Sequence, residues 1–193
     1  MKKYFASVFI VLSIIAACKS SKQKNPQEKQ ANKKNFFPVA DYLQSEINYV
    51  DSLPLGIIRY TVHNSITDSV FIQSPEFNQI AKDFICPELK PDIFENEFSE
   101  SSFIDETTQS ATFIYSTKNN KLELQRVDVI ANAGEGTNKV SSIYLEKVIH
   151  KNDTLTVKKL LWRTRKSFQI ITSIQPSNHA PVIKQVKVTW NPE

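Results

Sequence analysis

Glycine and cysteine are scarce in this chain. Its 193 residues contain three glycines, Gly56, Gly134 and Gly136, and two cysteines. Glycines at these positions cannot build the glycine-rich loops that hold phosphates or dinucleotides, so nucleotide sites of that type are excluded. Two cysteines exclude a disulfide framework and a four-cysteine zinc site. A hydrophobic content of 40% and an aromatic content of 10% nevertheless predict a folded domain rather than a disordered chain.

The residue types that carry chemistry form no catalytic or metal-binding pattern. The three histidines, His63, His150 and His179, have no partner at helical spacing and no cysteine nearby, so we expect no metal site. No serine lies in a Gly-x-Ser-x-Gly sequence, and no HExxH sequence is present. Cys86 follows an apolar helical stripe with no base beside it, which favours a buried, unreactive thiol. The sequence therefore predicts no catalytic residue, no metal and no cofactor.

An acidic stretch is the one region that offers other chemistry. Residues 88–106 contain seven acids and a single base, Lys90. Calcium uses such oxygen ligands, but the spacing and the glycine of an EF-hand are absent. Nothing in the stretch selects a carboxylate pair for glycoside hydrolysis, so a carboxylate-dependent hydrolase is the less favoured alternative. We interpret the stretch as a solvated loop, in which residues 105–108 turn the chain into its next strand.

The N-terminal residues have the pattern of a secretory signal. Lys2 and Lys3 supply a positive start, and residues 5–17 form an apolar stretch of 13 residues. A membrane-spanning helix needs about 20 apolar residues, so this stretch is too short to span and fits a signal sequence. We therefore predict a signal peptide over residues 1–17.

The end of this signal, Ile15-Ala16-Ala17-Cys18, resembles the lipobox of bacterial lipoproteins at every position. The resemblance implies that the chain is cut before Cys18, which becomes the mature N-terminus and carries lipid on its thiol. Two or three acyl chains, at about 0.8 kcal/mol for each buried methylene, would hold the protein on the membrane. The alternative is an ordinary secretory signal that is cut after Ala17, with an incidental cysteine.

The residues after Cys18 predict a location and a spacer. Lys19 stands where many lipoproteins of the inner membrane have an aspartate, so the resemblance favours the outer membrane, on its periplasmic face. Residues 18–35 contain six lysines, one acid and almost no apolar side chain, a composition typical of a flexible basic tether. A coil of this length spans about 23 Å.

The positive net charge of the chain belongs to its N-terminal region. The whole chain has a net charge of +4, of which residues 1–35 contribute +7 and residues 36–193 contribute −3. A domain of negative net charge lacks the basic footprint of a nucleic-acid-binding protein, so we predict no nucleic-acid partner. Within the domain, residues 36–117 carry −10 and residues 118–193 carry +7. These halves either attract each other inside the fold or form two faces for a charged partner.

A run of basic residues with a central aromatic extends from Lys158 to Lys166. We interpret it as one strand and its turn, with Leu161 or Trp162 facing the core. In an envelope protein, the partner of these bases would be lipid phosphate or the acidic half of the domain.

The apolar spacing predicts two early helices and a late series of strands. Residues 38–51 and 75–85 repeat apolar side chains at three- and four-residue steps. Between them, residues 58–72 alternate like a β-hairpin around Asn64-Ser65. Residues 86–106, broken by Pro87 and Pro91, are expected to be irregular or weakly helical. Six further strands are expected at 111–118, 122–132, 140–150, 155–163, 168–175 and 182–190.

The expected fold class is α+β. It consists of a curved antiparallel β-meander of about five to seven strands with the two N-terminal helices packed on one face, in one domain of residues 36–193. The apolar phase changes face between Leu124 and Val127, which predicts a bulge. This element order is similar to that of periplasmic half-barrel lipoprotein carriers and related lipid-binding envelope lipoproteins. The resemblance implies an apolar cleft between the sheet and the helices.

These patterns together predict a membrane-anchored periplasmic lipoprotein that acts as a non-enzymatic binding or assembly module. An apolar ligand such as a lipid, held in a cleft, is the specific version. The alternative is an envelope scaffold that docks onto another envelope protein through its charged faces. The expected partners are therefore the membrane, through the lipid on Cys18, and either an apolar ligand or an envelope protein. The sequence assigns no ligand-binding residue.

Overall fold

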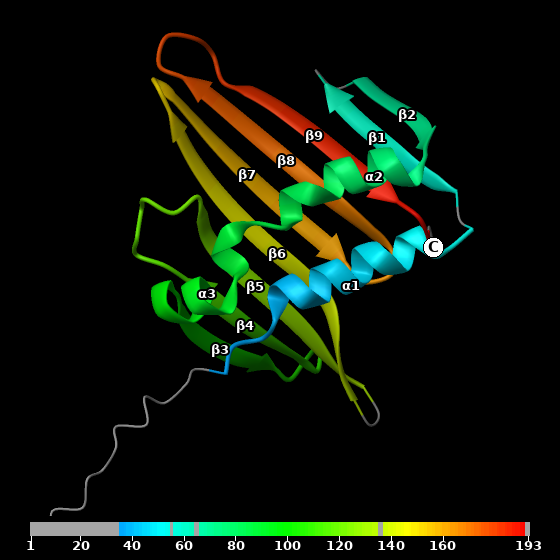
Figure 1. Cartoon of the computed structure of the whole chain (residues 1–193), viewed down its shortest axis with the longest axis vertical. Helices are drawn as coiled ribbons and strands as arrows, with labels where there is room; N and C mark the ends of the chain where they lie inside the picture. The colour runs from blue at the N-terminus through cyan, green and yellow to red at the C-terminus, as the bar shows by residue number, and fades with distance from the viewer. Residues whose placement is uncertain (1–34, 55, 64–65, 135–136, 192–193) are drawn as a thin grey trace, which may run out of the picture. The chain divides into compact units, whose positions relative to one another are not determined.

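The computed structural model describes residues 35–54, 56–63, 66–134 and 137–191. These residues contain an antiparallel sheet of nine strands and the helices that lie against it. Across the sheet the order is β2-β1-β9-β8-β7-β6-β5-β4-β3, so β1 joins the early hairpin to the last strand (Figure 1). The sheet is not closed, and β2 and β3 are its edges. The strands are β1 (Ile57–His63), β2 (Ile66–Ile72), β3 (Ser99–Asp105), β4 (Ser110–Ser116), β5 (Leu124–Gly134), β6 (Thr137–Lys151), β7 (Thr154–Arg163), β8 (Ser167–Pro176) and β9 (Val182–Thr189).

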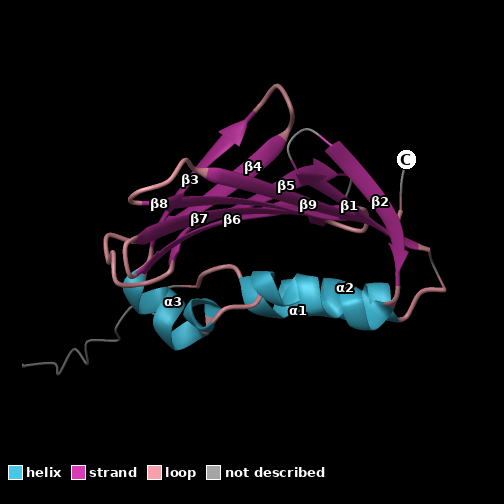
Figure 2. Cartoon of the chain, turned by 90° about the horizontal axis from the view of Figure 1, so that it is seen from above, coloured by secondary structure: helices cyan, strands magenta, loops and turns pink. Residues whose placement is uncertain are grey.

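The helices of the described residues lie on one face of the sheet, which bends over them (Figure 2). Pro75 and Pro91 stand in the first turns of two of these helices, where the fixed φ of proline favours helix formation. None of the described helices is long and apolar enough to cross a membrane. They are α1 (Val39–Asp51), α2 (Ser74–Ala81) and α3 (Pro91–Glu97), with 3-10 turns at Lys82–Phe84 and Pro87–Leu89.

The core between helices and sheet is built around packed aromatic rings. The strand register places Trp162, Phe168 and Val188 side by side on the face that the helices cover. Phe77 of α2 and Phe84 pack onto this row, with ring centroids 5.2 Å apart for Phe84 and Trp162 and 5.7 Å apart for Phe77 and Phe168. All five side chains are at most 1% exposed. The space between this part of the sheet and its helices is therefore filled by side chains.

Most of the elements expected from the sequence are confirmed. The first helix and all six late strands form within a few residues of their expected bounds, and α2 continues as a 3-10 turn to Phe84. The bulge is confirmed as well, because the pairing of β5 with β6 changes register between Leu124 and Arg126. The Asn64-Ser65 turn lies outside the described residues.

Two expectations about the fold are wrong in part. The described residues form nine strands and three α-helices, not five to seven strands and two helices. Residues 86–106 contain the short helix α3, in keeping with the weakly helical alternative, but also the strand β3, which was not expected. The edge strand β3 gives no apolar alternation in the sequence because residues 99–104 are exposed, and its pairing with β4 is what defines it. The hairpin adds two more strands, since β1 pairs with β9.

Candidate functional site

The basic and aromatic run at residues 158–166 divides its side chains between the two faces of the sheet. Leu160 and Trp162 of β7 face the helices and are fully buried, which confirms that Trp162 belongs to the core. Because side chains alternate along a strand, Arg163 lies on the opposite face. The run ends in the β7–β8 turn, residues 164–166, whose side chains reach both faces of the sheet.

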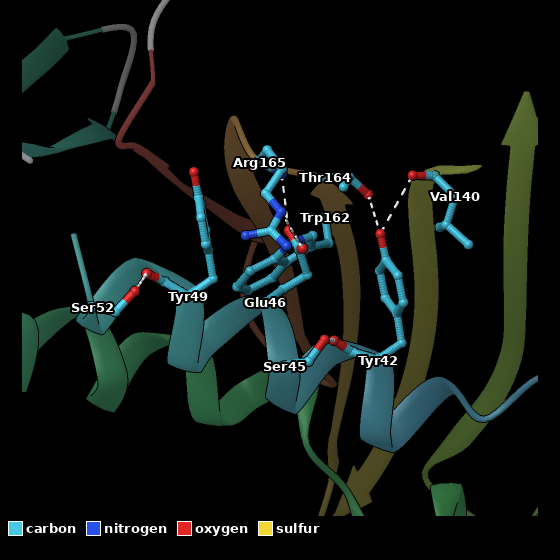
Figure 3. A network of polar contacts seen from close by, with 9 residues as sticks. All are labelled: Tyr42, Ser45, Glu46, Tyr49, Ser52, Val140, Trp162, Thr164 and Arg165. Atoms are coloured by element: carbon cyan, nitrogen blue, oxygen red, sulfur yellow. Dashed lines mark hydrogen bonds and ion pairs between the residues drawn. The ribbon is translucent and has the colours of Figure 1, made fainter. Parts of the chain in front are cut away.

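The helix α1 holds the β7–β8 turn from the covered side of the sheet (Figure 3). Glu46 is 2% exposed, and its Oε2 accepts the backbone N–H of Arg165 at 2.9 Å and the indole N–H of Trp162 at 3.3 Å. Its Oε1 lies 3.0 Å from Arg165 Nε, in an ion pair. One turn of helix earlier, the hydroxyl of Tyr42 lies 2.8 Å from Thr164 Oγ1. A buried carboxylate and a phenol thus fix two successive residues of the turn.

The same turn is also tied to the last strand. Arg165 has a φ of 62°, a left-handed conformation that is uncommon outside glycine, and its guanidinium stacks 3.5 Å above the centre of the Tyr49 ring. The backbone N–H of Lys166 donates to the carbonyl of Arg163 at 3.1 Å. The carbonyl of Lys166 in turn accepts the N–H of Trp190 at 3.2 Å. The turn is therefore held by α1 and by the residue that follows β9.

A surface pocket of about 230 Å³ opens beside this turn, where β1, β7, β8 and β9 meet. Its strand residues lie on the face away from the helices. Tyr60 is the cross-strand neighbour of Lys187, and Ser167 is that of Thr189, so the sheet register sets the pocket walls. Among the described residues, the lining combines three basic side chains with residues that carry hydroxyl and amide groups, and it includes no acid from the described ranges: Tyr60, Arg163, Lys166, Ser167, Lys187, Thr189 and Asn191.

Two hydroxyl residues of the lining are buried. Ser167 is 7% exposed and Thr189 is 8% exposed. Thr189 Oγ1 has no hydrogen-bond partner among the described residues. A buried polar group that lacks a partner destabilises a fold by roughly 1–3 kcal/mol. This hydroxyl is shielded from solvent, so a ligand in the pocket reaches it only if the Thr189 side chain turns toward the pocket.

The acidic and basic halves of the domain meet at some positions and stay apart at others. Of the four ion pairs formed by described residues, two join the halves: the pair under the β7–β8 turn, and Lys158 with Asp83 at 2.8 Å. Arg163 and Lys187, in the pocket, form no ion pair with an acid of the described ranges. The first sequence alternative, attraction between the halves, therefore holds on the covered face, whereas a charged face for a partner stays a prediction.

The acids of residues 88–106 are used in part by the fold. Glu88 is 9% exposed, and its Oε1 accepts the backbone N–H groups of Glu123 at 3.1 Å and Leu124 at 3.3 Å. It thereby ties the segment before α3 to the start of β5. A carboxylate engaged by two backbone donors in this way supports the structure.

Asp105 forms the turn that the sequence predicts. Its carboxylate accepts the hydroxyl of Thr108 at 2.8 Å and the backbone N–H of Thr107 at 2.9 Å. These hydrogen bonds, the Thr108 hydroxyl first, lower the pKa of Asp105 because they favour its ionised form. The turn leads from β3 into β4, as expected for this sequence.

The other residues singled out in the sequence do not come together. Cys18 lies outside the described residues. His63 ends β1, His150 lies near the end of β6, and His179 lies in the loop before β9. Within the described ranges, no three residues of the His, Cys, Asp and Glu types are close enough to hold a metal ion. Cys86 is half-buried, and burial raises the pKa of its thiol to about 12, so the thiol stays neutral at pH 7.

Sequence reasoning misses both Glu46 and the pocket. Glu46 carries a signal that could reveal it, because it stands on the apolar stripe of its helix, three residues after Leu43 and four before Val50. An acid in that position is expected to be buried with a partner. The pocket gives no such signal, since its lining comes from β1, β7, β8 and β9, and only the register brings Tyr60 beside Lys187.

The pocket and the hydrogen-bonded β7–β8 turn beside it together form the candidate functional site. The pocket is basic, open at the surface and fixed on two sides by hydrogen bonds of the β7–β8 turn. Comparisons with protein-family models, with curated proteins and with solved structures gave no match.

Proposed function

We propose that this chain is a bacterial envelope lipoprotein whose folded domain is a non-enzymatic binding module. The lipobox pattern at residues 15–18 and the basic tether that follows it support an anchor, lipid on Cys18, in the periplasmic leaflet of the outer membrane. The observation that carries the binding role is the pocket beside the β7–β8 turn. It is charged and open, and its shape is set by contacts within the fold.

The packing of the core favours this surface site over an apolar cleft between the sheet and the helices. The rings of Phe77, Phe84, Trp162 and Phe168 fill the space in which a lipid tail would lie, and each is at most 1% exposed. A ligand in that space would have to displace closely packed rings, and close-packed interiors resist such rearrangement. We therefore propose a polar ligand at the surface in place of an apolar ligand inside.

A scaffold role is the second candidate function, and the uncovered face of the sheet favours it. The described helices all lie on the other face (Figure 2). The uncovered face presents a second group of charges beyond the pocket, with Arg126 paired to Asp128 at 2.7 Å and Glu146 bonded to the hydroxyl of Tyr144 at 2.7 Å. A charged envelope protein could dock on such a face.

Site-specific photocrosslinking in intact envelopes tests the proposed function. A photoreactive amino acid is placed in the full chain at Tyr60, in the pocket, or at Gln44, an exposed residue of α1. We expect an adduct of constant mass at position 60 and none at position 44, with the chain in the membrane fraction. Cys18→Ser, in a chain whose residues 1–17 are replaced by an ordinary cleavable secretory signal, should release the protein from that fraction.

Two results would contradict the proposal. Equal adducts at both positions would indicate collision instead of binding at the pocket. Retention of the Cys18→Ser chain in the membrane fraction after its secretory signal has been removed would contradict the lipid anchor.

A further inference from the structure

The lining of the pocket beside the β7–β8 turn has the composition of an oxyanion site, and we infer that it binds a phosphate group. This inference rests on the proposed binding function and names its ligand class. The ligand would be a phosphate monoester, or a lipid headgroup that ends in phosphate.

The charge of the lining is the first argument. Arg163, Lys166 and Lys187 line a space to which residues 35–191, as far as they are described, contribute no acid. A planar guanidinium matches phosphate oxygens in pairs, and an ammonium group adds a point charge. A phosphate monoester carries a charge of about −1.5 to −2 at pH 7, which suits a site with several cations better than a singly charged carboxylate does.

The neutral donors are the second argument. Three residues with hydroxyl groups, Tyr60, Ser167 and Thr189, and the amide residue Asn191 line the same space. A carboxylate offers two oxygens, whereas a phosphate monoester offers three free oxygens that can accept bonds from several donors at once. The Thr189 hydroxyl is buried and has no partner among the described residues, so it gains an acceptor when its side chain turns toward a phosphate in the pocket.

The size and rigidity of the pocket are the third argument. Its volume of about 230 Å³ is below the range of roughly 300–1,000 Å³ typical of pockets for drug-sized ligands, so it suits a compact group. The opening leaves the rest of the ligand in solvent. Glu46 and Trp190 hold the backbone of the turn, so a ligand would order little of the main chain on binding.

Titration with inorganic phosphate tests the inference. The protein is the mature chain from residue 18 with Cys18→Ser, which keeps the tether and the whole domain but cannot carry lipid. Calorimetry at constant ionic strength should give one site with a Kd of about 1 mM or tighter, reasonable for so small a ligand. Vesicles of phosphatidylcholine with and without phosphatidic acid, mixed with the same protein, then distinguish a headgroup from a soluble phosphate ester.

Substitutions in the lining should weaken phosphate binding in a defined order. Combining Arg163→Gln with Lys187→Gln should raise the Kd at least about tenfold, because two charged donors are lost. Thr189→Val removes only the buried hydroxyl, and it should raise the Kd about threefold or more while the melting temperature stays the same or rises. Lys159→Gln is the matched control, since Lys159 lies on the same face of β7 but outside the pocket, and its Kd should stay within about twofold.

Three results would overturn the inference: no saturable phosphate binding, an unchanged Kd in the Arg163→Gln and Lys187→Gln protein, or equal weakening by Lys159→Gln. Capture by phosphatidic acid vesicles that the double substitution abolishes would support a headgroup, and binding of free phosphate alone would support a soluble ester. If the crosslinked adduct at position 60 forms but phosphate does not bind, the ligand class is wrong and the proposed binding function stands.

Discussion

Trp162→Ala should lower the free energy of unfolding by about 3–5 kcal/mol, the usual range for removal of a buried tryptophan. Trp162 is fully buried, and its ring centre lies 5.2 Å from that of Phe84 and 5.3 Å from those of Phe168 and Trp190. The substitution leaves a cavity in this layer and also removes the indole that donates to Glu46. Urea denaturation followed by circular dichroism measures the change.

A substitution on an exposed part of the same sheet provides the control. Ile183→Ala removes an apolar side chain that is 64% exposed on β9, and surface changes of this kind usually stay within about 0.5 kcal/mol. A loss below about 1 kcal/mol for Trp162→Ala would mean that the aromatic layer is loosely packed. That outcome would restore the apolar cleft as the better account of the domain.

Glu46→Ala should lower the free energy of unfolding by about 2–4 kcal/mol, because two donors lose their acceptor and each unpaired donor costs about 1–3 kcal/mol. The donors are the indole N–H of Trp162 and the backbone N–H of Arg165. Arg165 also loses its ion pair, but its side chain is 49% exposed, so water screens that part of the effect. Urea denaturation again gives the change in stability.

A second readout separates a positioning role of Glu46 from a purely stabilising one. Loosening the β7–β8 turn should weaken phosphate binding at a temperature where the protein remains folded, because Arg163 and Lys166 border that turn. Glu46→Gln retains a carbonyl oxygen for the N–H of Arg165 and should recover part of both effects. Gln44→Ala, on the exposed side of α1, should change neither. Equal stability of Glu46→Ala and the unchanged chain would contradict the role given to this network.

The elements of this fold were predictable wherever a side-chain pattern reflects burial. The first helix shows its stripe because Val39, Leu43 and Val50 all turn to the core. The bulge in β5 shows itself as a change of apolar phase at Leu124, since that side chain is fully buried. Strand β3 shows no pattern because its side chains are exposed instead of buried in the core, so that only the pairing with β4 defines it as a strand.

The site was less predictable because it depends on register between distant strands. The bases at residues 158–166 suggest two partners, lipid phosphate or the acidic half of the domain. Lys158 and Arg165 meet the acidic half, at Asp83 and Glu46, whereas Arg163 lines the pocket. Side chains alternate between the two faces along β7, so Lys158 and Arg163 lie on opposite faces. Only the tertiary structure brings Lys187 of β9 to the same pocket as Arg163.

Native mass spectrometry tests the central claim, a surface-binding module with a filled core, most directly. The mature chain with Cys18→Ser is secreted to the periplasm, extracted gently and measured with and without added phosphate. Without added phosphate, the account predicts the mass of the bare chain or of the chain with a polar, phosphate-bearing adduct. With added phosphate, it predicts a phosphate adduct that the combined Arg163→Gln and Lys187→Gln substitutions remove. A reproducible apolar adduct that organic solvent strips would contradict the account and place the ligand inside the domain.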